Sequence, residues 1–115
     1  MEVSECDRLP SDTPLGLDGI FTFVYDYPLS KKATFDHPLI SSVSAIDILA
    51  IAKADYEFIY AAEEADDGPT ENIPGMLNRA SSDGRYGIWG HCIEDLFFEG
   101  IKIDESNIVE FVIGS

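Results

Sequence analysis

The sequence predicts an α+β domain in which one long helix packs on an antiparallel sheet of about four strands, with the elements in the order β-α-β-β-β. Three observations predict this class. Aromatic residues alternate early in the chain, a long alanine-rich stretch without Gly or Pro follows, and the last third returns to period-two alternation. At 115 residues we expect a single acidic domain spanning 1–115.

The first strand is expected over residues 20–27, after an irregular N-terminal arm at 1–19 that is broken by Pro and Gly. Within 20–27 the aromatic residues occupy alternate positions, which is typical of a strand with one apolar face. Pro28 ends this strand. We expect a loop over residues 28–42, because this stretch contains two lysines and Pro38.

A helix is expected from about residue 45 to residue 64. Ser44 and Asp47 have the spacing of a capping box, and apolar residues from Ile46 to Tyr60 can share one broad face. Gly68 follows shortly afterwards as a stop signal. The alternative is a strand over 56–60, since Y-E-F-I-Y also alternates in part.

The remaining strands are expected after a long polar connection at residues 66–85. A short strand is expected over 86–90 and a C-terminal hairpin over 95–113, with a turn at 104–107. Within 95–104 the apolar phase slips by one residue at Glu99-Gly100, which predicts a bulge. Cystatin-like folds have a comparable order of elements; the likeness is architectural only, because the cystatin inhibitory motifs are absent.

The charge is the strongest pointer to function. The chain holds 22 Asp and Glu against 7 Lys and Arg, a formal net charge of −15, yet 45% of its residues are hydrophobic. A disordered acidic segment lacks such apolar content, so we expect the charge to lie on a folded surface. An acidic surface disfavours direct binding to nucleic acid or to an anionic membrane.

No secretory signal or membrane span is recognisable, and Cys6 and Cys92 are too few for a disulfide framework. We therefore expect a cytoplasmic protein with reduced thiols. The sequence leaves the oligomeric state open.

One acidic cluster is concentrated in residues 54–78, which hold seven acids and no base. Glu63, Glu64, Asp66 and Asp67 lie at the C-terminus of the expected helix, where carboxylates oppose the helix dipole. Placement against the dipole suggests a role beyond solubility, although a solvated acidic helix end explains the cluster equally well. We expect these side chains to contact a partner in place of phosphates: Asp55, Glu57, Glu63, Glu64, Asp66 and Asp67.

A second acidic patch is expected at Glu94, Asp95 and Glu99. Both patches suit a partner protein with a basic, nucleic-acid-facing surface, because complementary charge speeds association. The hypothesis is an inhibitor without a cofactor: an immunity protein for a nuclease toxin, or a mimic of DNA. Tyr56 and Tyr60 lie within the first cluster, as interface anchors or as core residues.

The first alternative is a cation-binding protein that uses the acidic loop at 63–72, which lacks the EF-hand spacing. The second is an enzyme or a small-ligand domain. His91 and Cys92 are adjacent, and neighbouring strand residues point to opposite faces, so thiol catalysis is not expected. Nothing in the spacing brings His37, His91 and Asp36 together at a zinc ion.

Overall fold

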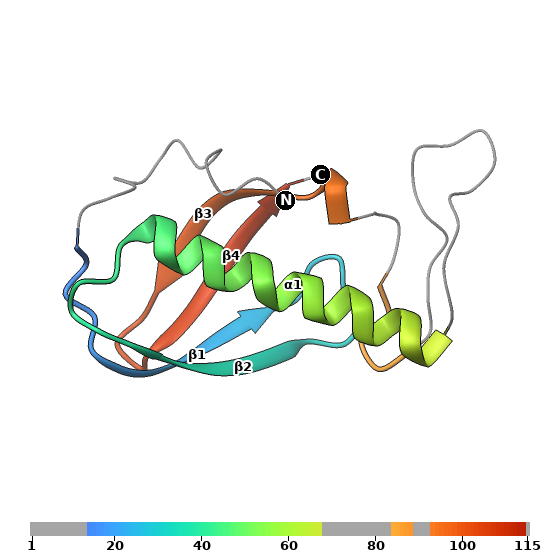
Figure 1. The fold of residues 1–115 in the computed structure, drawn as a ribbon, viewed down its shortest axis with the longest axis horizontal. Helices are drawn as coiled ribbons and strands as arrows, with labels where there is room; N and C mark the ends of the chain where they lie inside the picture. The colour runs from blue at the N-terminus through green and yellow to red at the C-terminus, as the bar shows by residue number, and fades with distance from the viewer. Residues whose placement is uncertain (1–13, 68–83, 89–92, 115) are drawn as a thin grey trace.

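The fold is built from four strands and one long helix in a computed structural model that describes residues 14–67, 84–88 and 93–114. The side chains of Asp66, Asp67 and Asp95 lie outside the described part. In chain order the elements are β1 (Gly19–Tyr25), β2 (Ala33–Leu39), α1 (Ala45–Asp67), the short 3-10 helix η2 (Ile93–Asp95), β3 (Phe97–Ile103) and β4 (Ile108–Gly114). Figure 1 shows α1 lying across one face of the sheet.

The strands form one mixed sheet in the order β2-β1-β4-β3. β1 pairs antiparallel with β2, and β3 pairs antiparallel with β4. The two central strands, β1 and β4, run parallel, with Phe23 opposite Val109. A parallel pair needs a crossover connection, and the chain between β1 and β4 includes the helix that covers the sheet.

The expected architecture of one long helix on a four-stranded sheet is confirmed, although the sheet is mixed and not wholly antiparallel. The order along the chain differs. A loop was expected at residues 28–42, but β2 lies within this range and precedes the helix. Pro38 lacks an N–H group and Asp36 is an exposed acid. Because neither residue is typical of a strand, the sequence pattern did not predict β2. Both features are tolerated because β2 is an edge strand of the sheet.

The strand expected over 86–90 is not found in its described part. There, Ile88 makes only an isolated bridge with Leu29, and the rest of that prediction falls on residues outside the described ranges. The C-terminal hairpin is confirmed, and its register shifts between Phe98 and Gly100 as the apolar pattern predicts. In the turn, Asn107 has a φ of 60°, and the Asp104 carboxylate accepts bonds from the N–H groups of Ser106 and Ile108.

The helix begins with the expected capping box. The Ser44 N–H and hydroxyl donate to Oδ2 of Asp47 at 3.0 and 2.9 Å, and the Asp47 N–H donates back to Oγ of Ser44 at 3.4 Å. These bonds lower the pKa of Asp47. Their stabilising effect is therefore present at neutral pH and is lost as the pH falls through the lowered pKa. The alternative strand at 56–60 is wrong, since α1 runs without interruption to Asp67.

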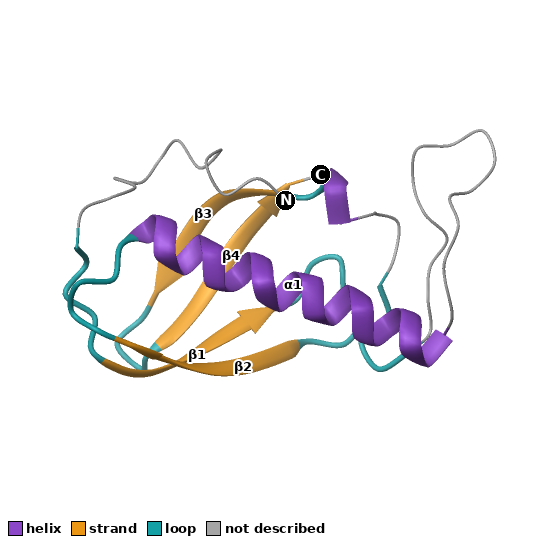
Figure 2. Ribbon diagram, viewed as in Figure 1, coloured by secondary structure: helices purple, strands orange, loops and turns teal. Residues whose placement is uncertain are grey.

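The core lies between α1 and the sheet (Figure 2). Its helix side is a stripe at helical spacing, and its sheet side is the alternate residues of β1 together with Phe98 and Val109. Tyr56 and Tyr60 belong to this core, so they are not exposed anchors. Within the described ranges, no helix is long and apolar enough to cross a membrane.

We predict that Ser44→Ala lowers the free energy of unfolding by about 1 kcal/mol, because the side-chain acceptor at the helix start is lost. Ser42→Ala is the matched control, because Ser42 is exposed and makes no side-chain hydrogen bond with the described residues. Urea denaturation at pH 7 measures both. Equal stability of the two variants would contradict the capping role.

Candidate functional site: the carboxylates of helix α1

The acids that the sequence groups into one patch are divided by the helix between two sides. Asp55 and Glu63 face the core and are 8% and 0% exposed, whereas Glu57 and Glu64 are exposed. The expectation of an exposed position was therefore wrong for Asp55 and Glu63. By helical periodicity, positions 55 and 63 fall on the same side of the helix as the buried apolar residues, whereas positions 57 and 64 fall on the outer side.

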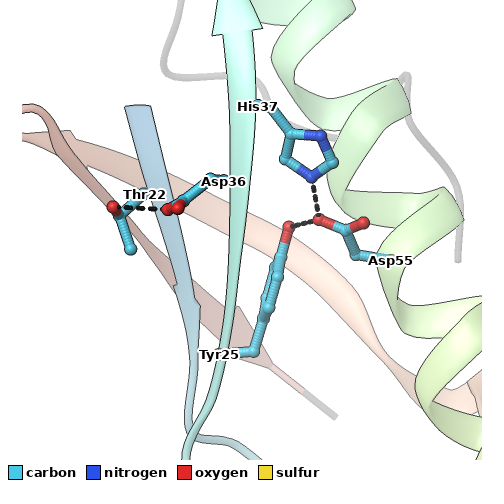
Figure 3. Close-up of polar contacts among 5 residues, drawn as sticks. All are labelled: Thr22, Tyr25, Asp36, His37 and Asp55. Atoms are coloured by element: carbon cyan, nitrogen blue, oxygen red, sulfur yellow. Dashed lines mark hydrogen bonds and ion pairs between the residues drawn. The ribbon is translucent and has the colours of Figure 1, made fainter. Parts of the chain in front are cut away.

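The Asp55 carboxylate lies between α1 and two strands (Figure 3). The Tyr25 hydroxyl donates to its Oδ2 at 2.5 Å, and Nε2 of His37 lies 2.7 Å from the same oxygen. Tyr25 belongs to β1 and His37 to β2. One carboxylate thus links the helix to both strands, and its two donors offset the desolvation of a buried charge.

Two buried tyrosines of the core have raised pKa values. Burial raises the pKa of Tyr25, and the hydrogen bond to Asp55 raises it further. Burial is also the largest cause of the raised pKa of Tyr56, and the nearby Tyr60 and Asp26 raise this pKa further. The Tyr56 hydroxyl donates to the Tyr27 carbonyl oxygen at 2.7 Å. At neutral pH each tyrosine is therefore protonated and acts as a hydrogen-bond donor.

The Glu63 carboxylate is surrounded by backbone N–H groups of residues 84–88. Oε2 accepts from Gly84 at 2.9 Å, from Gly87 at 3.0 Å and from Ile88 at 3.4 Å, while Oε1 accepts from Tyr86 at 3.0 Å. These donors supply the charge compensation that a carboxylate near a helix C-terminus otherwise lacks. The unfavourable placement of Glu63 in the sequence therefore has a structural explanation.

Gly87 is required for this arrangement. Its φ is +61°, and a Cβ atom at this position would lie 1.9 Å from Oγ of Ser30. The Ser30 hydroxyl and N–H both bond to the Gly87 carbonyl oxygen. Residues 84–88 therefore approach both Glu63 and the β1–β2 connection, which only glycine allows at this point.

The second predicted patch, Glu94, Asp95 and Glu99, is described only in part. Glu94 is exposed on η2, which packs against α1, and the Asp95 side chain lies outside the described part. Glu99 follows the core residue Phe98 at the bulge. A Cβ atom on Gly114, whose partner is Phe97, would lie 2.9 Å from Oε1 of Glu99. Because Phe98 faces the helix, Phe97, Gly114 and Glu99 lie toward the other face of the sheet.

Several of the residues considered above as zinc or cation ligands make other contacts in the structure. His37 bonds to Asp55, whereas Asp36 faces away and accepts from Thr22 at 2.8 Å (Figure 3). No group of three potential metal-ligating side chains occurs among the described residues. Glu63 of the expected cation loop is held by the 84–88 backbone. His91, Cys92 and the stretch 68–72 lie outside the described part.

Sequence reasoning weighed His37 only as a zinc ligand and did not single out the exposed Phe58. The signal for His37 was its alternation with Phe35 in A-T-F-D-H-P-L, which the following Pro38 obscured. Phe58 is 53% exposed on the outer side of the helix. The apolar pattern alone gave no reason to separate it from the buried helix residues around it.

Comparison with known proteins identifies no relative. No family model matches the chain, and no curated protein or solved structure matches it significantly.

We predict that Glu63→Gln lowers the free energy of unfolding by roughly 2–4 kcal/mol, because the amide loses the charge and turns an NH₂ group toward backbone donors. The neighbouring Glu64→Gln should change it by less than about 0.5 kcal/mol, since Glu64 is exposed. Urea denaturation of the two variants is the measurement. Similar values would show that the observed hydrogen bonds do not stabilise the fold.

We predict that alkali unfolds the protein as the pH rises above 10.0, the ordinary tyrosine pKa. Both buried groups ionise more readily in the unfolded chain, so stability that is full below pH 10 falls above it. Tyr25→Phe and Tyr56→Phe should each reduce this loss. Absorbance of ionised tyrosine, followed together with circular dichroism, tests this. Full ionisation of all tyrosines in the folded protein would contradict it.

Proposed function

We propose that this protein acts by binding a partner protein that has a basic, nucleic-acid-facing surface. In concrete form it is an inhibitor, such as an immunity protein to a nuclease toxin or a mimic of DNA. The observation that carries the proposal is the outer side of α1, where Glu57 and Glu64 are exposed on a regular helix. Glu94 on the adjoining η2 adds a third exposed carboxylate.

The local geometry supports contact with a cationic surface. Glu57 lies 4.0 Å from Lys53, whereas Glu64 and Glu94 make no ion pair with the described residues. Small exposed alanines adjoin these acids on the outer side, at positions 50, 54, 61 and 65. Small neighbours allow a partner to approach the helix closely.

The spacing of the charges suits recognition rather than internal stability. Glu57 and Glu64 are seven residues apart, which is about 10 Å along a helix. This is close to one Debye length at 0.1 M salt, so salt weakens their mutual repulsion. Each carboxylate remains able to pair with a partner cation, and the net charge of −15 favours the encounter.

The partner-facing set accordingly consists of Glu57, Glu64 and Glu94. Asp66, Asp67 and Asp95 remain predictions from the sequence. Asp55 and Glu63 contribute by shaping the helix position rather than by exposed charge. A location in the cytoplasm accords with this proposal and remains part of it.

We predict that charge reversal of Glu57, Glu64 and Glu94 to Lys slows association with the partner about tenfold or more. The partner is first recovered by affinity capture at low salt and should be released at high salt. A control triple reverses Asp36, Glu105 and Glu110, which are exposed elsewhere, so both triples change the net charge equally. Surface plasmon resonance compares the association rates.

Capture of only salt-insensitive, neutral partners would contradict the proposed function. Equal slowing by the two triples would show that total charge matters and that the outer side of α1 does not.

A further inference from the structure

The seam between α1 and the edge strand β2 combines aromatic rings with a buried carboxylate. Since β2 has a neighbour on one side only, its helix-facing side chains at 35 and 37 are half-buried rather than buried. We define the aromatic seam by four residues: Phe35, His37, Asp55 and Phe58.

The rings of the seam form a continuous series. The Phe58 ring meets Phe35 edge to face, with centroids 5.7 Å apart. Phe35 stacks with the His37 ring at 6.5 Å and an interplanar angle of 30°. Because Phe58 is 53% exposed, its ring is open to a molecule that approaches along the seam.

A carboxylate adjoins the inner end of this series. Both donors to Asp55, from Tyr25 and His37, bond to Oδ2. Oδ1 accepts no hydrogen bond from any residue that the structure describes. Figure 3 shows Oδ1 directed away from the Tyr25 hydroxyl and the His37 ring. One oxygen of this carboxylate, whose residue is 8% exposed, is therefore left without a donor among the described residues.

These features suit one kind of side chain. A planar guanidinium stacks on aromatic rings, is always charged and is less strongly hydrated than an ammonium group. We propose that the aromatic seam receives an arginine side chain of the basic partner protein. This inference rests on the proposed function and specifies where the partner's cation docks.

The test uses fluorescence anisotropy at low salt with labelled hexa-arginine and hexa-lysine peptides as probes. Phe58→Ala should weaken hexa-arginine binding about two- to fivefold, the effect of one cation–π contact at an exposed site. Hexa-lysine binding should change less than twofold. Because Phe58 is exposed, the variant keeps the fold, which circular dichroism verifies.

Two controls separate the ring from general apolar area. Phe58→Tyr retains an aromatic face and should bind hexa-arginine as the wild type does. Ile20→Ala removes a side chain that is 59% exposed on the face of the sheet opposite the core residue Phe21, and it should have no effect.

Each outcome bears on a different statement. If hexa-arginine binds but Phe58→Ala behaves like Ile20→Ala, the seam is not the docking site, and the proposed function stands. If Phe58→Ala weakens both peptides equally, the preference for arginine is overturned. If neither peptide binds at low salt, the proposed function fails and this inference fails with it.

Discussion

Burying negative charge on the helix is the constraint on which this structure depends. A carboxylate removed from water is tolerated only when donors replace its hydration. α1 buries Asp55 and Glu63 on its sheet-facing side, and the two find their donors in different places. Side chains of β1 and β2 supply those of Asp55, and the backbone of 84–88 supplies those of Glu63.

These two sets of donors determine how the elements meet. The Asp55 bonds place the middle of α1 over β1 and the edge strand β2. The Glu63 bonds hold residues 84–88 against the last part of the helix, where Gly87 must also fit against Ser30. The outer side of α1 is then left to Glu57, Glu64 and Phe58, which are the residues on which the proposed interaction rests.

The parallel pairing of β1 and β4 follows from the same arrangement. Two antiparallel hairpins, β1–β2 and β3–β4, meet along their inner strands. The helix lies between them in sequence and covers the face they share. Each hairpin leaves one strand at an edge; β2 contains Pro38, which has no N–H group, and β3 has a bulge after Phe98. Such features discourage pairing with other strands.

Local sequence patterns determined the helix, its capping box at Ser44 and Asp47, the first strand, and the bulged C-terminal hairpin, because each depends on neighbours within a few residues. Only the tertiary structure decided that β2 is a strand, since its edge position permits Pro38 and an exposed Asp36. It also decided which carboxylates are buried. Glu63 and Glu64 are adjacent and chemically identical, but Glu63 lies on the sheet-facing side of the helix, where backbone donors 21 or more residues away reach it.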